Sequence, residues 1–168
     1  IALLPEVDTM LRVNNLTKVY DDGTVALKDV SFTIPNGVFL VVIGLSGSGK
    51  STLLRCINRL IDPTEGDIIW NGVNITGLQG GDLRKTRRKI GMIFQHFNLV
   101  KRSSVLKNVL SGRLGYTSSW NSLFGRFSEE DQEKAWQSLE RLGIEDQAYK
   151  RADELSGGQQ QRVGVARA

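Results

Sequence analysis

A glycine-rich loop that ends in a lysine is the clearest candidate for chemistry in this sequence. Residues 44–52 read GLSGSGKST, and the positions that fit the pattern GxxxxGK[ST] are Gly44, Gly49, Lys50 and Ser51. Glycines let the main chain wrap a triphosphate closely, and a helix that starts here offers free N–H groups at its positive end. We expect Lys50 to reach the β- and γ-phosphates and the Ser51 hydroxyl to ligate Mg²⁺, with the amides of residues 47–52 lining the site.

The segments around this loop favour a phosphate site over a chance Gly-Ser turn. The apolar run VFLVVI at 38–43 predicts a strand buried on both faces, and a helix is expected over 50–60. Strand, loop and helix in this order form the P-loop unit. The single cysteine, Cys56, lies in the helical pattern and excludes an internal disulfide. A packed core thiol is favoured there over a reactive one.

A second glycine-containing string, LSGGQQQR, covers residues 155–162. Ser156 and Gln159 have the spacing of a capping box, so this string could simply start a helix. A helix start does not explain Gly157 and Gly158, since each glycine costs about 1 kcal/mol of helix propensity relative to alanine. The pair favours a place where another group approaches the main chain closely.

The length lies within the range of a single domain, and the composition is ordinary for a soluble globular protein. The chain has 168 residues, of which 40% are hydrophobic and 24% charged. No apolar run approaches the roughly 18 residues of a membrane span, and the first residues lack the basic start of a secretory signal. The net charge of +4 favours anionic partners. Met10 is expected to be the natural start, with residues 1–9 a non-native or disordered leader.

Periodicity predicts a β-rich first half. Apolar and polar residues alternate over 11–35 and are interrupted by the turn at 21–23, which predicts a small antiparallel sheet. A short strand at 67–70 ends at the turn Asn71-Gly72. A basic helix over 82–88 and a strand over 90–94 follow.

From residue 99 on, the sequence pattern is typical of helices. One helix is expected over 103–113, and residues 115–127 are typical of a loop or irregular lobe. Ser128, followed by three acidic residues, has the pattern of an N-cap. The helix that it starts is expected to run to Leu142, with Gly143 as its stop.

Taken together, the loop at 44–52 and the string at 155–162 resemble the motifs of ATP-binding cassette (ABC) ATPases, where such a string is the signature motif. The resemblance covers the chain from about residue 11 to its end. It implies an α/β fold: a P-loop NTPase core with an antiparallel β subdomain and an α-helical subdomain, incomplete at the C-terminus. It also implies ATP and Mg²⁺ as ligands, and a head-to-tail homodimer in which each loop faces the partner's signature motif.

The same resemblance assigns expected roles to individual residues. Gln95, in MIFQHFN, matches the Q-loop glutamine, which senses Mg²⁺ and the attacking water. Tyr20 matches the aromatic residue that stacks on adenine, with a core-facing strand tyrosine as the alternative. Lys50 and Gln95 are expected to be catalytic, and Ser51 and Gln95 to bind the metal. The residues expected to contact ATP are Tyr20, Gly44, Ser46, Gly47, Ser48, Gly49, Lys50, Ser51, Thr52, Ser156, Gly157, Gly158 and Gln159.

Three other features carry weaker predictions. His96 is the only histidine and does not match the family's switch histidine, so no catalytic role is assigned to it. The run RKTRRK at 84–89 could contact nucleic acid or membrane phosphates, but a solvated helix face is favoured. Trp120, Phe124 and Phe127 could dock a transmembrane partner or pack internally, and both interpretations stay open.

The segment 108–136 resembles the helical lobe of bacterial phosphonate importer ATPases, through Gly112-Arg113-Leu114-Gly115 and the long insert that follows. Gly164, where alanine or another helix former is common, is a small departure from the family. The resemblance implies permease subunits at the cytoplasmic face of the bacterial inner membrane, a periplasmic or lipid-anchored solute-binding protein acting indirectly, and no nucleic acid. An ABC ATPase for another solute, or one without a transport role, is the alternative.

The family also requires a Mg²⁺-binding Asp, a catalytic Glu and a switch His beyond the signature helix. Because the sequence ends at Ala168, we expect a fragment that keeps binding surfaces but hydrolyses ATP negligibly by itself. Phosphate release comparable to that of a complete homologue would contradict this. The expected parts are a nucleotide-binding core with its β subdomain at 10–98, a helical subdomain at 99–155 and the signature helix at 156–168.

Overall fold

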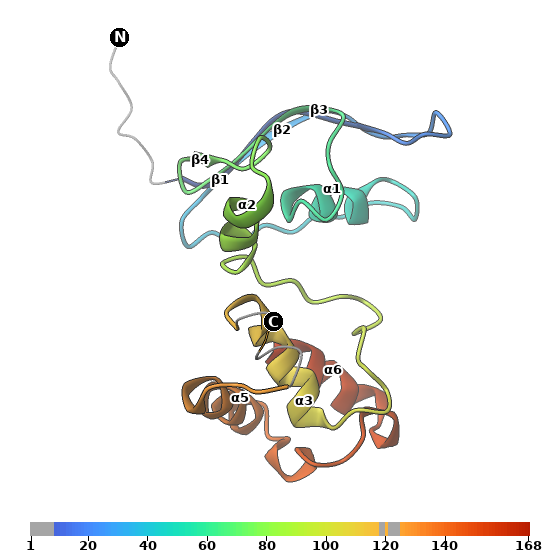
Figure 1. Ribbon diagram of the computed structural model, residues 1–168. Coiled ribbons are helices and arrows are strands. Elements are labelled where there is room, and N and C mark those ends of the chain that lie inside the picture. Colours follow the sequence, from blue (N-terminus) through green and yellow to red (C-terminus); the bar gives the residue numbers. More distant parts are fainter. Residues whose placement is uncertain (1–8, 118–119, 121–124) are drawn as a thin grey trace. The chain divides into compact units, whose positions relative to one another are not determined.

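The computed structural model describes residues 9–117, 120 and 125–168 (Figure 1). The chain divides into two compact units, Ile1–Ile90 (unit 1) and Gly91–Ala168 (unit 2). The expected division at 10–98, 99–155 and 156–168 stays a prediction. Most of the expected leader lies outside the described residues.

Unit 1 is built on an antiparallel sheet. In chain order its strands are β1 (Thr9–Val19), β2 (Val25–Pro35), β3 (Glu65–Trp70) and β4 (Val73–Asn74). Their spatial order is β2-β1-β3-β4. Both predicted hairpin turns are present, one between β1 and β2 and one between β3 and β4. The predicted small antiparallel sheet is therefore confirmed.

Two helices, α1 (Lys50–Ile57) and α2 (Gly80–Arg87), accompany the sheet. α1 ends at Ile57, short of the predicted 50–60, because Arg59 adopts a left-handed φ of 54° that a helix cannot continue through. Cys56 is fully buried, as predicted for a core thiol, and this burial raises its pKa. The buried core of unit 1 consists of Leu11, Val13, Leu16, Leu27, Ile34, Leu53, Cys56, Ile68 and Ile75.

The strands predicted at 38–43 and 90–94 are not formed. The run at 38–43 is exposed rather than buried on both faces, with Phe39 90% and Ile43 87% exposed. A strand is stable only when a neighbour pairs with its main-chain N–H and C=O groups. In the described part of the chain the sheet contains only β1 to β4, so the apolar run has no partner strand.

Unit 2 is helical. It contains α3 (Val105–Leu110), the 3₁₀ turn η1 (Ser111–Gly115), α5 (Glu129–Arg141), the short turns η2 (Glu145–Gln147) and η3 (Ala152–Glu154), and α6 (Gly157–Arg167). The helix predicted over 103–113 is thus an α-helix continued by a 3₁₀ turn. Its buried core consists of Val105, Val109, Leu110, Ala135, Leu139, Ile144, Ala148, Leu155 and Val163.

The predicted ends of α5 are confirmed. The Ser128 side chain accepts a hydrogen bond from the Asp131 amide at the N-cap, and Gly143, with φ of 60°, follows the C-cap. None of the helices in the described part of the chain is both long and apolar enough to cross a lipid bilayer.

The basic run and the aromatic residues have different surroundings. In the run at 84–89 the residues at 84, 85, 88 and 89 are exposed, as predicted for a solvated face, whereas Thr86 and Arg87 are partly buried. Trp120 is 74% exposed, whereas Phe127 packs against the core of unit 2. Phe124 lies outside the described residues.

Candidate nucleotide site

The glycine-rich loop leads directly into the first turn of α1, and residues 44–48 are exposed. Gly47 and Gly49 have left-handed φ values of 81° and 86°, which glycine adopts without steric cost. A Cβ at Gly49 would lie 2.3 Å from the Ala26 carbonyl oxygen of β2, whereas a Cβ at Gly47 would meet no atom within 4 Å. Gly49 is therefore required by the close approach of β2 to the loop.

The Lys50 ammonium is turned back onto its own loop. Its Nζ donates to the Gly44 carbonyl at 2.8 Å, the Leu45 carbonyl at 2.6 Å and the Ser48 hydroxyl at 3.2 Å. An ammonium has three donors, and all three are used here. The loop thus curls around one positive charge, and phosphate oxygens are the kind of acceptor that could replace these uncharged oxygens.

Tyr20 lies beside the phosphate loop although it precedes the loop by more than twenty residues. Its hydroxyl is 3.2 Å from the Thr52 hydroxyl on α1, and the Lys18 ammonium lies 5.4 Å from its ring centroid. The ring is partly buried and is not part of the buried core of unit 1. Ser46 and Ser51 are exposed on the loop and on the first turn of α1.

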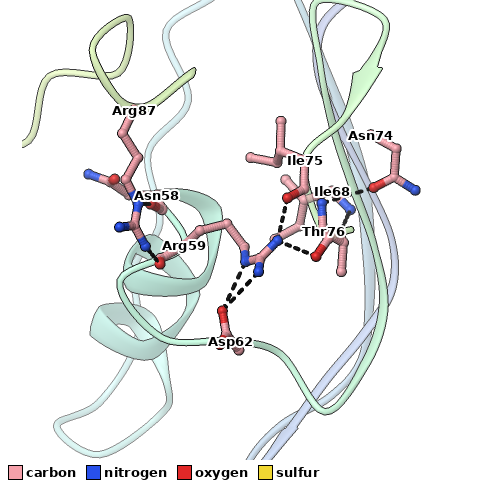
Figure 2. Close-up of polar contacts among 8 residues, drawn as sticks. All are labelled: Asn58, Arg59, Asp62, Ile68, Asn74, Ile75, Thr76 and Arg87. Atoms are coloured by element: carbon pink, nitrogen blue, oxygen red, sulfur yellow. Dashed lines mark hydrogen bonds and ion pairs between the residues drawn. The ribbon is translucent and has the colours of Figure 1, made fainter. Parts of the chain in front are cut away.

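The opposite end of α1 is held by two arginines that sequence reasoning missed. Arg59, only 7% exposed, donates to the carbonyls of Ile75 and Thr76 and pairs with Asp62 at 3.0 Å. Arg87 of α2 donates to the carbonyls of Asn58 and Arg59, where α1 ends (Figure 2). Arg87 thus places a cation at the negative end of the α1 dipole and satisfies carbonyls there, whereas Arg59 ties the end of α1 to the segment after β4. The one available signal was an arginine in the largely apolar stretch CINRLI.

The signature string forms the start of α6, as predicted. The Gln159 amide donates to the Ser156 hydroxyl at 3.3 Å, and the Gln159 side chain accepts from the Ser156 amide at 2.9 Å, which completes the capping box. Gly157 and Gly158 are exposed, and a Cβ on either would meet no atom within 4 Å. Internal packing therefore does not explain these glycines.

Gln95 is exposed in a turn of unit 2, and the residues after it are fixed to α6. Phe97 and Asn98 have left-handed φ values of 53° and 46°. Arg167, near the end of α6, donates to their carbonyls at 2.5 and 2.7 Å. Gly164 packs against Phe97. The segment after Gln95 and the signature helix are thus joined within unit 2, a link that the sequence alone did not predict.

The expected site residues fall into two groups. Tyr20 and the loop residues lie in unit 1, whereas Gln95 and the signature residues 156–159 lie in unit 2. Their combination into one site stays a prediction. No group of three or more His, Cys, Asp or Glu side chains in the described ranges could hold a metal ion. Mg²⁺ commonly binds through one or two protein groups together with substrate phosphates, so a site based on Ser51 remains chemically consistent.

The sheet, the helical unit and the two glycine motifs together define a P-loop ATPase cassette. The sequence pattern of the ABC transporter family matches residues 27–168. The chain belongs to this family.

Individual relatives agree with this assignment. The "Phosphonates import ATP-binding protein PhnC" of Lactobacillus johnsonii is 60% identical over 158 residues, which cover 94% of this chain and 62% of that protein. A PhnC 2 protein of Halalkalibacterium halodurans is 60% identical over 159 residues, covering 95% of this chain and 65% of that protein. The chain thus spans less than two thirds of the length of these curated relatives.

Solved structures support the fold. The dimeric structure of MJ0796, a bacterial ABC transporter cassette, has a TM-score of 0.81 at 38% identity and covers 94% of this chain and 68% of that chain. A post-hydrolysis state of the same cassette bound to ADP and Pi gives the same values. The predicted fold class, an ABC ATPase of the α/β P-loop type, is confirmed.

Proposed function

We propose that this chain supplies the nucleotide-binding surfaces of the ATP-hydrolysing subunit of an ABC importer for phosphonates or phosphate-type oxyanions. The observation that carries the proposal is the open space over Gly157 and Gly158 at a capped helix N-terminus. The main-chain N–H groups there lack intrahelical partners, and the absence of side chains lets an anion approach them. In a head-to-tail dimer that anion is the γ-phosphate held by the partner's loop.

In this proposal each ATP is held by the phosphate loop of one subunit and contacted by the signature motif of the other. The triphosphate takes the place of the Gly44 and Leu45 carbonyls around Lys50, whose charge then neutralises phosphate oxygens. Amides of residues 47–52 line the cradle, and Ser51 and Gln95 are the protein ligands for Mg²⁺. When bound, Mg²⁺ neutralises charge that develops on the transferred phosphoryl group. Tyr20 stacks on the base.

The wider assembly is part of the same proposal. Two such subunits bind transmembrane permease subunits at the cytoplasmic face of a bacterial inner membrane, and Gln95 links ATP binding to them. A solute-binding protein delivers the solute. The names of the relatives support phosphonate as the solute, and the structures of dimeric cassettes support the pairing.

A matched set of glycine variants tests the dimer. Wild-type chain is expected to dimerise on addition of Mg·ATP in analytical ultracentrifugation. Gly157→Ala and Gly158→Ala should raise the stability of α6 through helix propensity and yet weaken this dimerisation, because each methyl fills the space left for phosphate. Gly81→Ala in α2, which also meets no atom, is the control and should leave dimerisation unchanged. Equal dimerisation by Lys50→Met and wild type would overturn the proposal.

The solute is tested separately. A bacterial strain that lacks the gene for this protein should lose growth on an alkylphosphonate as sole phosphorus source and keep growth on orthophosphate-rich medium. Normal growth on alkylphosphonates, with loss of uptake of another solute, would redirect the assignment within the family.

A further inference from the structure

The β1–β2 hairpin contacts residues on both sides of the loop lysine, Lys50. From the β1 side, the Tyr20 hydroxyl lies 3.2 Å from the Thr52 hydroxyl. From the β2 side, the Ala26 carbonyl approaches Gly49 so closely that a Cβ there would lie 2.3 Å from its oxygen. Gly49 and Thr52 flank Lys50 and Ser51 in the sequence. One hairpin therefore contacts the chain on either side of the two residues expected to carry the phosphate chemistry.

Tyr20 is fixed at its main chain, at its hydroxyl and on one ring face. Its amide donates to the Thr24 carbonyl and its carbonyl accepts from the Gly23 amide, both at 2.9 Å. Lys18, two positions earlier in an extended segment, projects to the same side. The Lys18 ammonium lies 5.4 Å from the ring centroid, within the range of about 6 Å for a cation–π contact. A base can therefore stack on the opposite face of the ring.

We infer that the Tyr20 hydroxyl and Thr52 form a positioning pair that sets the distance between the base-stacking ring and the phosphate loop. This inference rests on the proposed function. Because Thr52 belongs to α1, its hydrogen bond ties the ring to the helix whose first turn binds phosphate. A ring held in place loses less freedom when a base stacks on it, and preorganisation of this kind raises affinity.

The inference separates two roles for Thr52 and gives the hydroxyl of Tyr20 a role of its own. The Thr52 amide is expected to line the phosphate cradle, whereas its hydroxyl lies within hydrogen-bond distance of the Tyr20 hydroxyl. Loss of the Tyr20 hydroxyl should therefore weaken binding of the nucleoside part of ATP and leave binding of phosphate groups unchanged. If the Tyr20 ring contributed only stacking, Tyr20→Phe would not weaken ATP binding, because phenylalanine also stacks on a base.

The experiment measures binding of ATP and of inorganic tripolyphosphate to the chain by isothermal titration calorimetry. Tyr20→Phe should weaken ATP binding about three- to tenfold, as expected for one hydrogen bond, with tripolyphosphate affinity unchanged. Thr52→Val should weaken ATP binding at least as much, because Thr52 is also expected to contact phosphate. The double variant should lose no more ATP affinity than Thr52→Val alone, because both changes remove the same interaction. Thr52→Ser, which keeps the hydroxyl, should restore ATP affinity.

Matched controls test whether the effect is local. Tyr149→Phe and Thr33→Val remove a hydroxyl from exposed residues outside the site and should leave both affinities unchanged, and thermal melting of every variant verifies that it is folded. Wild-type ATP affinity in Tyr20→Phe, equal losses of ATP and tripolyphosphate affinity in that same variant, or additive losses in the double variant would overturn the inference. A wild-type chain that binds neither ligand, or a Lys50→Met variant that binds tripolyphosphate normally, would instead overturn the proposed function.

Discussion

The Arg113 guanidinium donates from Nε to the Asp131 carboxylate at 2.6 Å and so joins the turn after α3 to the first turn of α5. The second carboxylate oxygen accepts from the Ser128 hydroxyl at 2.9 Å, and that hydroxyl caps α5 by accepting from the Asp131 amide. The three side chains thus link η1 to the N-terminus of α5 within unit 2.

This ion pair makes the stability of unit 2 depend on pH. Burial by itself raises the pKa of Asp131, but the hydrogen bonds from Arg113 and Ser128 outweigh it, so that the pKa lies below its ordinary value. A carboxyl with a lowered pKa stabilises the fold above its unfolded pKa of about 3.9 and loses that contribution as pH falls through the folded pKa. Asp131→Asn should therefore cost about 1–3 kcal/mol of unfolding free energy near neutral pH and progressively less below pH 4.

Urea unfolding at several pH values measures this difference. Glu130→Gln, which removes an exposed neighbour that pairs with Lys134, is the control and should leave the unfolding free energy unchanged within error. A cost of Asp131→Asn that is constant down to pH 2 would contradict the role of the ionised carboxylate.

Gly49 and Gly47 offer a comparison of steric and conformational effects. Both have left-handed φ, but only Gly49 lies against the Ala26 carbonyl. Gly47→Ala should cost about 1–2 kcal/mol, the price of left-handed φ for a residue with a Cβ. Gly49→Ala should cost more and also weaken nucleotide binding, since the loop must move away from β2. Equal unfolding free energies for the two variants would show that β2 yields to the methyl group.

The Arg59 network predicts an asymmetry between its two charged members. Arg59→Met leaves the Ile75 and Thr76 carbonyls without their donor in a buried place (Figure 2) and should destabilise unit 1 by about 2–4 kcal/mol. Asp62→Asn removes a carboxylate that is 76% exposed, so its effect should stay below about 1 kcal/mol. Thermal melting of the two variants measures the difference, and a larger effect of Asp62→Asn would contradict the assigned roles.

Gly164 is expected to be a site of easy stabilisation. It lies inside α6, and a Cβ there would meet Phe97 at 3.4 Å, an ordinary contact. Gly164→Ala should therefore raise the unfolding free energy by about 0.5–1 kcal/mol through helix propensity. If chemical denaturation gives a lower unfolding free energy for Gly164→Ala than for the wild type, the Phe97 side chain cannot move to make room for the methyl group.

The sequence by itself determined the features that depend on neighbours along the chain. The caps at Ser128 and Ser156, the hairpin turns and the helix that begins at Lys50 were all predictable, because each rests on hydrogen bonds or φ preferences within about four residues. The family motifs at 44–52 and 155–162 were readable for the same reason. The prediction of a strand at 38–43 was wrong, because an apolar pattern does not show whether a neighbouring strand is available to pair with it.

Only the tertiary structure decided which distant groups meet. The Tyr20 and Thr52 hydroxyls, the Arg59 side chain on the carbonyls after β4, and Arg167 on the carbonyls after Gln95 are contacts between segments far apart in the sequence. Sequence periodicity does not predict such contacts. Every residue has a main-chain carbonyl, so the sequence does not show which carbonyl a given arginine will contact. Packing of the sheet against α1, and of α6 against α3 and α5, selects the few that form.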